Sequence, residues 1–285
     1  MESGGSVGVE MSTVARIHPC TTTMSAASCF TMKRGFQFRR SYVGLEKNAV
    51  FRASRFERVG RENFAVAFSG SVSEPFEVCV KASVTEKDKL GDCPFSQRVL
   101  LTLEEKNLPY IMKMVDLRNK PEWFLEINPE GSVPVIKLEE QWVSGSDVIT
   151  EMLEERFPDP KLKAPSEKAA IGSKIFSAFI GFLKSKDPSD GTLKTLLTEL
   201  TTFNEYLVDN GPFITGERIC SADLSLGPKL YHMEVALGHY KQWSVPNTLP
   251  YVQSYMKAIF SLHSFAKTRP IPEDVISGWL PKVMG

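Results

Sequence analysis

Residues 91–99 have the sequence GDCPFSQRV, and the chemistry of this stretch indicates how the chain around it folds. Pro94 suits the first position of a helix, because the N–H that proline lacks would be unpaired there in any case. Apolar side chains then recur at helical spacing and predict one buried face, formed by Phe95, Val99, Leu100 and Leu103. We therefore expect a helix that begins at Pro94 and has Cys93 as its N-cap.

Short apolar strands alternate with helical segments around this helix. Strands are predicted over residues 75–82, 110–116, 132–137 and 141–145, and helices over residues 93–107, 119–128 and from 146 onward. Pro121 suits the first turn of the second helix, and Ser146 suits the cap of the third. The order strand–helix–strand–helix–strand–strand–helix predicts a thioredoxin-like domain over residues 74–158.

A different pattern follows a proline-broken linker, PDPKLKAPSE, at residues 158–167. From there on, the apolar residues recur only at helical spacing, in stripes that are typical of a helix core and not of a cofactor site. We expect an all-helical domain over residues 166–285. The predicted fold class is therefore α/β plus all-α.

The first 73 residues differ in composition from the rest of the chain. Residues 1–30 hold nine Ser/Thr and one Arg, and Arg-rich sequence follows them. This Ser-rich, acid-poor pattern predicts a disordered transit peptide over residues 1–73. The scarcity of Arg at the start favours the chloroplast stroma over the mitochondrion, and the alternative is a disordered tail that is never cleaved.

Charge and cysteine content exclude several classes of protein. The formal net charge is zero and residues 74–285 carry a net charge of −5 without a basic stripe, so nucleic acid is not an expected partner. The five scattered cysteines predict no disulfide framework, and no Cys/His spacing predicts a metal site. No stretch approaches 18 apolar residues, so we expect no stable membrane association.

Cys93 has four alternative roles: buried packing, a disulfide, a metal ligand or a nucleophile. Cysteine is often buried, so packing is the first alternative. At a helix N-cap, however, free backbone N–H groups and the helix dipole stabilise a thiolate, and Gly91 allows the preceding loop to turn tightly. We expect Cys93 to be a nucleophile, Cys79 to be packing within a strand and Cys220 to be structural.

Ser96 stands one helical turn after Cys93. A dithiol enzyme would have a resolving cysteine at this position, where it could attack the first sulfur. With serine there, an oxidised Cys93 needs a thiol from another molecule. This requirement predicts a binding site for an external thiol in the first domain.

Seven stretches together resemble the glutathione transferase superfamily and, within it, the plant dehydroascorbate reductases. They are VCVKAS (78–83), LGDCPFSQRVLLTLEEKNLPY (90–110), NKPEWFLEINPEGSVPVI (119–136), SDVITEMLEE (146–155), SKIFSAFIGFLKSKDPSDG (173–191), ADLSLGPKLYH (222–232) and GWLPKV (278–283). The resemblance covers essentially all of residues 76–285, and the prefix suggests the chloroplast form. It implies a monomer that reduces dehydroascorbate with glutathione as co-substrate and with no bound cofactor.

The resemblance also implies a glutathione site. A cis Val133–Pro134 step would let glutathione pair with the Val133 backbone, and Ser146 and Asp147 would hold its γ-glutamyl carboxylate at a helix N-terminus. Lys120 matches the lysine that pairs with the glycine carboxylate. Gly145 departs from the pattern, since many relatives have an acidic residue there.

Four further residues match positions that line the dehydroascorbate cleft in this family: Lys81, Asp92, His232 and Trp279. The Lys81 ammonium would favour the Cys93 thiolate and the oxygen that gains charge, whereas the Asp92 carboxylate opposes thiolate formation. His232 and Trp279 would face the cleft from the helical domain.

One departure and two alternative functions accompany the resemblance. Cys220 replaces the Ser or Thr of a capping box three residues before Asp223, so Ser221 is an alternative cap. The alternative functions are a glutathione-dependent thioltransferase of the same fold and a membrane-inserting protein similar to the chloride intracellular channels, which share the CPFS site.

Overall fold

The protein was analysed as a computed structural model that describes residues 74–86 and 88–285. These residues belong to one unit of the chain. The transit peptide predicted over residues 1–73 lies outside the described residues.

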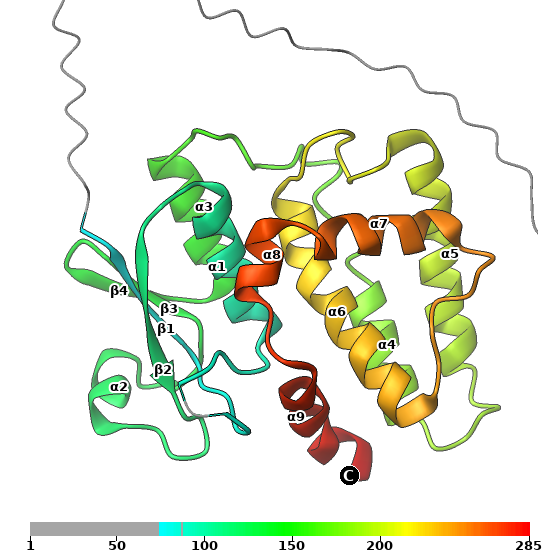
Figure 1. The fold of residues 1–285 in the computed structure, drawn as a ribbon, viewed down its shortest axis with the longest axis horizontal. Coiled ribbons are helices and arrows are strands. Elements are labelled where there is room, and N and C mark those ends of the chain that lie inside the picture. The colour runs from blue at the N-terminus through cyan, green and yellow to red at the C-terminus, as the bar shows by residue number, and fades with distance from the viewer. Residues whose placement is uncertain (1–73, 87) are drawn as a thin grey trace, which may run out of the picture. The chain divides into compact units, whose positions relative to one another are not determined.

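The described chain begins with strands and helices in alternation and continues with helices alone (Figure 1). The first part contains β1 (Phe76–Lys81), α1 (Pro94–Glu105), β2 (Tyr110–Val115), α2 (Glu122–Ile127), β3 (Val135–Leu138), β4 (Gln141–Ser144) and α3 (Ser146–Arg156). The second part contains α4 (Ile175–Lys184), α5 (Thr192–Asn210), α6 (Ser221–Lys241), α7 (Pro250–Phe260), α8 (His263–Thr268) and α9 (Pro272–Met284). The predicted order of elements is confirmed.

The four strands form one mixed sheet in the order β2-β1-β3-β4. β1 runs parallel to β2 and antiparallel to β3, with Cys79 opposite Val135. Val78 and Val80 pack against α1 and α3 on one face, and Cys79 packs with Phe124 of α2 on the other. Because both faces of the sheet are covered, the central residues of β1, Val78, Cys79 and Val80, are apolar and fully buried, as in a thioredoxin-like fold.

The helical half is built around α6, which packs against α1, α4, α7 and α9. Residues from α4 and α5 that recur at helical spacing form its core with α6, as the sequence predicted. They include Ile175, Phe179, Leu183, Leu196, Leu200, Phe203 and Leu207. Among the residues that the structure describes, no helix combines the length and hydropathy needed to cross a membrane.

Three predicted element starts are shifted. Pro121 has an extended backbone (φ −63°, ψ 146°), so it is the N-cap of α2 and not part of its first turn. Ser146 is the first residue of α3, since Gly145 takes the cap position at φ 89°, a conformation that glycine adopts without steric cost. β3 begins at Val135, three residues later than predicted.

The start of α6 keeps the capping position that the sequence suggested. Cys220 is the N-cap, and its N–H donates to Asp223 Oδ2 at 2.8 Å. Ser221 is therefore not the cap, and its hydroxyl accepts from Ala164 N–H at 3.1 Å instead. Burial raises the pKa of the Cys220 thiol to about 11, which agrees with a structural role.

The connection between the two halves is anchored by a buried lysine. Lys106 Nζ lies 2.7 Å from Glu154 Oε2 and donates to the carbonyl oxygens of Phe157 and Pro160 at 2.6 and 2.9 Å. Its side chain has no exposed surface. These contacts hold the segment after α3 against the C-terminal end of α1.

Candidate active site

Cys93 is the N-cap of α1, as predicted. Its backbone is extended (φ −121°, ψ 106°), and its Sγ accepts a hydrogen bond from Ser96 N–H at 3.4 Å. The sulfur therefore takes the place of the side-chain oxygen that usually caps a helix. The residue is half-buried, whereas Cys79 and Cys220 are buried.

The loop before Cys93 folds back onto the end of β1 through Gly91. Gly91 N–H donates to Lys81 O at 2.7 Å, and a Cβ at this position would lie 2.3 Å from Ala82 O. Only glycine allows this close backbone contact. The prediction of a tight turn at Gly91 is confirmed, and the turn brings Cys93 beside the end of β1.

Ser96 lies inside the protein one turn after Cys93. Its side chain is fully buried, and its Oγ has no hydrogen-bond partner among the described residues. Cys79, the other cysteine of this half, is buried in the sheet, and burial raises the pKa of its thiol to about 11. The cysteines of the described chain, Cys79, Cys93 and Cys220, are all free, so no resolving thiol is paired with Cys93.

Lys81 and Asp92 form an ion pair beside Cys93. Lys81 Nζ lies 2.7 Å from Asp92 Oδ1. Burial raises the pKa of Asp92, and the nearby Asp274 raises it further, while the hydrogen bond and charge of Lys81 act in the opposite direction. The Lys81 charge is thus partly neutralised by Asp92, which limits how strongly either group acts on a neighbouring sulfur.

His232 of α6 and Trp279 of α9 are in contact with each other inside the protein. Trp279 Nε1–H donates to His232 Nδ1 at 3.1 Å, and the two side chains are almost fully buried. Burial lowers the pKa of His232 to about 3, and the charges of Lys81 and Lys282 lower it further. His232 is therefore neutral at physiological pH, and because Nδ1 accepts a hydrogen bond, its proton is on Nε2.

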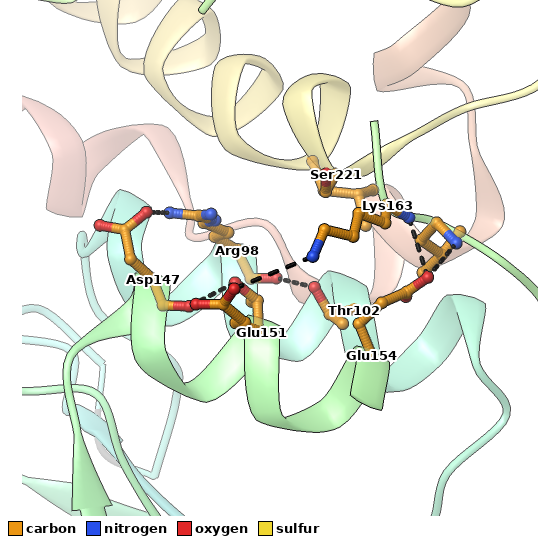
Figure 2. Close-up of a pocket in the computed structure, with 10 residues that line it drawn as sticks. Arg98, Thr102, Asp147, Glu151, Glu154, Lys163 and Ser221 are labelled. Carbon is orange, nitrogen blue, oxygen red and sulfur yellow. Dashed lines mark hydrogen bonds and ion pairs between the residues drawn. The ribbon is translucent and has the colours of Figure 1, made fainter. Parts of the chain in front are cut away.

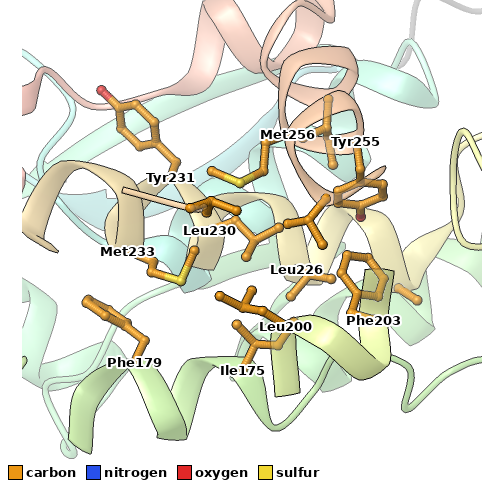
Figure 3. Close-up of a cluster of buried hydrophobic side chains, with 14 of the residues drawn as sticks. Ile175, Phe179, Leu200, Phe203, Leu226, Leu230, Tyr231, Met233, Tyr255 and Met256 are labelled. Atoms are coloured by element: carbon orange, nitrogen blue, oxygen red, sulfur yellow. The ribbon is translucent and has the colours of Figure 1, made fainter. Parts of the chain in front are cut away.

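Trp279 connects this pair to an aromatic wall. Its ring lies 5.0 Å from Phe179 and 6.2 Å from Phe176, both of α4, in edge-on contacts. Phe179 in turn faces Met233 of α6 in the helical core (Figure 3). The structure thus brings Lys81, Asp92, His232 and Trp279 into one neighbourhood, since Lys81 pairs with Asp92 and its charge acts on His232. His232 and Trp279, however, are buried.

Phe95 departs from its predicted position. The sequence placed it on the buried face of α1 with Val99, whereas its side chain is 42% exposed. It makes an edge-on contact with Phe176 at 6.3 Å, so it extends the aromatic wall from the helical half to the first turn of α1. Helical spacing alone missed this role, because the spacing within α1 does not show that Phe176 of α4 packs against its first turn.

The residues predicted to bind glutathione lie on two segments. The Val133–Pro134 bond is cis, as predicted, and it directly precedes β3. Lys120 lies across the turn at Gly131, where φ is +63° and a Cβ would be 2.7 Å from Lys120 Nζ. The lysine side chain therefore lies beside Gly131, two residues before Val133.

The second segment is the start of α3. Ser146 is buried in its first turn, while the Asp147 side chain is 89% exposed and forms an ion pair with Arg98 of α1. The sequence analysis did not identify Arg98. A basic residue five positions after Cys93 is a weak signal, since its partner is 49 residues away.

A cavity of about 210 Å³ adjoins Asp147 between α1, α3 and α6 (Figure 2). Arg98 and Asp147 lie at one end of it, and Lys163 reaches toward Glu151 across its middle. Cys93 does not line this cavity. It is therefore adjacent to the predicted γ-glutamyl site and does not reach the sulfur.

No group of three or more His, Cys, Asp or Glu side chains in residues 74–86 and 88–285 is arranged to hold a metal ion.

Comparison with known proteins agrees with this geometry. A family model of the glutathione S-transferase N-terminal domain matches residues 92–156. The probable glutathione S-transferase DHAR2, chloroplastic, of Oryza sativa subsp. japonica is 68% identical over 213 residues, which cover 75% of this chain and 78% of the rice protein. Glutathione S-transferase DHAR3, chloroplastic, of Arabidopsis thaliana is 65% identical over 228 residues, which cover 80% of this chain and 87% of that protein.

A solved structure shows the same relationship. The dehydroascorbate reductase of Chlamydomonas reinhardtii superposes with a TM-score of 0.65 at 36% identity and covers 73% of this chain and 99% of that one. The sheet, the helical half and the cysteine at the start of α1 define a protein of the glutathione transferase type. At the identities just given, the chain belongs to the dehydroascorbate reductase family within that superfamily.

Proposed function

We propose that the protein reduces dehydroascorbate to ascorbate with glutathione and that Cys93 is its nucleophile. The observation that carries the proposal is a cysteine N-cap followed by a buried serine in a chain of this family. Two glutathione thiols are oxidised to one disulfide, and their two electrons and two protons reduce one dehydroascorbate. The reaction requires no bound cofactor.

In the first half of the reaction, the Cys93 thiolate attacks an electrophilic carbonyl of dehydroascorbate. The sulfur bonds to the carbonyl carbon, and the carbonyl oxygen takes up a proton. A glutathione thiolate then attacks the Cys93 sulfur, the sulfur–carbon bond breaks, and its electron pair stays on the substrate, which leaves as ascorbate. Cys93 is left in a mixed disulfide with glutathione. In the second half, another glutathione thiolate attacks the glutathione sulfur of this disulfide. Glutathione disulfide leaves, and the electron pair of the broken bond returns to the Cys93 sulfur.

The Lys81 ammonium is assigned to stabilising the oxygen of the substrate that gains negative charge as ascorbate forms. The Lys81 side chain is 22% exposed, and Asp92 holds its ammonium in place beside Cys93. His232 and Trp279 support this end of the cleft from behind, because their side chains are buried. The neutral His232 is therefore assigned to orienting Trp279 and not to moving a proton.

The first glutathione is assigned to the edge of the thioredoxin-like half. Its backbone would pair with Val133, beside Pro134, and its glycine carboxylate would meet Lys120. Its γ-glutamyl group would lie at Ser146 and Asp147, where the first N–H groups of α3 favour a carboxylate.

Cys93→Ser tests the nucleophile. We expect the variant to lose glutathione-dependent dehydroascorbate reduction, whereas the matched variant Cys79→Ser keeps it. Full activity of Cys93→Ser would refute the mechanism. Ser96→Cys tests whether the serine at position 96 is what leaves Cys93 without a resolving thiol. After oxidation, this variant should form an internal disulfide with Cys93, detectable as a loss of two mass units.

A thioltransferase reaction is the second candidate, since the same monothiol site can reduce a mixed disulfide. Parallel assays with dehydroascorbate and a glutathionylated peptide separate the two functions. We expect the larger kcat/KM with dehydroascorbate.

The similar rice and Arabidopsis proteins are named chloroplastic, and this supports a chloroplast location for the present protein. We infer that residues 1–73 direct it to the stroma and are removed there, leaving a thioredoxin-like domain (74–158) and a helical domain (166–285). Import of a fluorescent protein fused to residues 1–73 tests whether these residues direct a protein to the chloroplast stroma. Light scattering on the purified protein tests the expected monomer.

A further inference from the structure

Arg98 of α1 and Asp147 of α3 form an ion pair at one end of the cavity between α1, α3 and α6 (Figure 2). The Arg98 side chain is 14% exposed and lines the cavity, whereas the Asp147 side chain is 89% exposed. Arg98 uses Nη1 for this pair, and its buried Nε has no hydrogen-bond partner among the described residues. A guanidinium has five N–H donors, so Arg98 can bind a second acceptor while it holds Asp147.

The charges near this end of the cavity leave a positive excess. Lys229 of α6 is close enough for both partners to act on it: burial lowers its pKa, the charge of Arg98 lowers it further, and Asp147 raises it. The Lys229 ammonium donates to Ser225 Oγ at 3.1 Å, and no carboxylate of the described residues pairs with it. Two cations thus share one carboxylate, and such a surface attracts a ligand that brings a carboxylate of its own.

The other carboxylates that line the cavity already have cationic or N–H partners. Glu154 is held by Lys106 at 2.7 Å and by two backbone N–H groups of the linker. Glu151 lies 3.9 Å from Lys163 across the middle of the cavity. Asp147 is therefore the exposed acidic side chain at the Arg98 end, where a positively charged group of a ligand would find its partner.

The cavity is large enough for such a ligand group. An engineered protein cavity of about 150 Å³ admits benzene, and the present cavity measures about 210 Å³. A cation and a carboxylate side by side complement a group that has a carboxylate and an ammonium on one carbon atom. The chemistry therefore fits the head group of an α-amino acid.

The proposed reaction supplies this head group. The γ-glutamyl end of glutathione is an α-amino acid, and its place at the start of α3 is part of the proposed function. Neither Gly145 nor Ser146 offers a carboxylate to its ammonium. Arg98 stands five residues after Cys93, about 7.5 Å further along α1. Adjacent residues of an extended peptide span such a distance, so the sulfur of glutathione could reach Cys93 while its head group meets Arg98.

We propose that Arg98 and Asp147 together select γ-glutamyl thiols, with the Arg98 guanidinium binding the carboxylate of the head group and Asp147 binding its ammonium. This inference rests on the proposed function, because it names the side chains that recognise the thiol substrate. The ion pair holds each partner in place before the ligand arrives. A thiol without an amino-acid head group should bind weakly.

The test measures equilibrium binding to the full chain with ligands whose sulfur is methylated and cannot react with Cys93. The first is S-methylglutathione. In two analogues, the γ-glutamyl group is replaced by 4-aminobutyryl, which lacks the carboxylate of the head group, or by glutaryl, which lacks its ammonium. Titration calorimetry gives the dissociation constants. We expect the wild type to bind each analogue about tenfold more weakly than S-methylglutathione, because each loses a contact between charged groups.

Substitutions assign the two contacts. Arg98→Gln should weaken the binding of S-methylglutathione about tenfold and should not weaken that of the 4-aminobutyryl analogue, which has no head-group carboxylate to lose. Arg98→Lys should keep part of the affinity, since the charge stays but the planar fork is lost. Asp147→Asn should bind the glutaryl analogue more tightly than the wild type does, because a repulsion between carboxylates is removed.

Arg156→Gln is the matched control. Arg156 pairs with Glu139 at 2.9 Å at the other end of α3 and does not line the cavity. Its substitution should leave all three dissociation constants unchanged. It therefore reports on the loss of a positive charge from the same half of the protein without the loss of the proposed contact.

The other outcomes overturn the inference. An equal loss of all three ligands in Arg98→Gln would mean that Arg98 only supports the structure, and no loss of S-methylglutathione would mean that it binds no carboxylate. Failure of the wild type to distinguish the three ligands would also refute it. A protein that reduces dehydroascorbate without this binding pattern would keep the proposed function and lose the inference. A protein with the Arg98-dependent pattern but without reductase activity would keep the head-group site and lose the proposed function.

Discussion

The Asp92 carboxylate lies so close to Gly278 of α9 that no side chain fits between them. A Cβ at position 278 would be 1.6 Å from Asp92 Oδ2 and 2.4 Å from its Cγ. The carboxylate is also held by Lys81, so it has little freedom to move aside. The last helix of the chain therefore helps to fix the residue before the nucleophile.

Gly278→Ala should displace either Asp92 or α9. We expect it to lower the free energy of unfolding by about 1–3 kcal/mol, since inserting an atom into a packed site forces the surroundings to shift. It should also lower kcat/KM for dehydroascorbate. Urea unfolding and initial-rate kinetics measure the two effects.

Gly238→Ala is the control for this change. Gly238 lies within α6 and has no atom within 4 Å of a Cβ, so alanine there should stabilise the protein slightly. The double variant Asp92→Ala/Gly278→Ala should recover most of the stability that Gly278→Ala loses. Purely additive losses in this cycle would show that the two residues do not compete for space.

Asp274 links α9 to the loop between β1 and α1. The buried Asp274 Oδ1 accepts from Val84 N–H at 3.1 Å, Thr85 N–H at 3.2 Å and Thr85 Oγ1–H at 2.9 Å. Asp274→Ala should expose these two amides and increase their hydrogen exchange, at a cost of about 1–3 kcal/mol in the free energy of unfolding. Asp274→Asn keeps an acceptor and should have a smaller effect.

Glu273→Ala, at the exposed neighbouring position, should leave the exchange of both amides unchanged. Equal exchange of Val84 and Thr85 in the wild type and Asp274→Ala would show that the carboxylate does not hold the loop.

The sequence predicted those features that depend on local chemistry. Pro94 and the apolar spacing behind it were sufficient to place α1 and its cap at Cys93, because helix starts are set by neighbouring residues. The cap at Gly145 was missed, since Ser146 is the commoner type of cap and only the positive φ shows that the turn needs glycine.

Long-range contacts could not be predicted in this way. Asp274 contacts a loop that lies 190 residues earlier, and no pattern within α9 indicates that its carboxylate reaches that loop. Family resemblance placed His232 near the cleft, but its burial follows from the packing of α6 against α9. The position of Phe95 could not be predicted for the same reason. Its contact with Phe176 of α4 is a long-range one, which the spacing within α1 does not show.

His232 should make stability depend on pH. Its pKa is about 3 in the folded protein and about 6.5 when unfolded, so the unfolded state binds a proton first as pH falls. The stabilisation is fully present above the unfolded pKa and is lost progressively as pH falls toward the folded pKa. As the pH falls from about 7.5 to 5, His232 should lower the free energy of unfolding by about 2 kcal/mol.

His232→Asn isolates this contribution, because its amide can still accept from Trp279 Nε1 but does not titrate. The measurement is urea unfolding of both proteins at the two pH values. We expect the wild type to lose about 2 kcal/mol more than the variant over this range. The same pH dependence in both proteins would show that the pKa of His232 is not lowered in the folded protein.

Lys106 and Glu154 form the most buried of the ion pairs described above, at 2.7 Å between Nζ and Oε2. Burial raises the pKa of Glu154, but hydrogen bonds from Lys106 and from the backbone N–H groups of Lys163 and Leu162 outweigh it, so the pKa lies below its usual value. Lys106→Met should lower the free energy of unfolding by about 3–5 kcal/mol, because it leaves a partly buried carboxylate and two carbonyl groups without a partner.

The double variant Lys106→Met/Glu154→Leu should lose less than Lys106→Met alone, since the uncompensated charge is gone. Arg156→Met removes one partner of the more exposed pair with Glu139 and should cost no more than about 1 kcal/mol. Urea unfolding of all three variants measures these differences. If Lys106→Met cost no more than Arg156→Met, the buried contacts of Lys106 between α1 and the linker would contribute no more to stability than a surface ion pair.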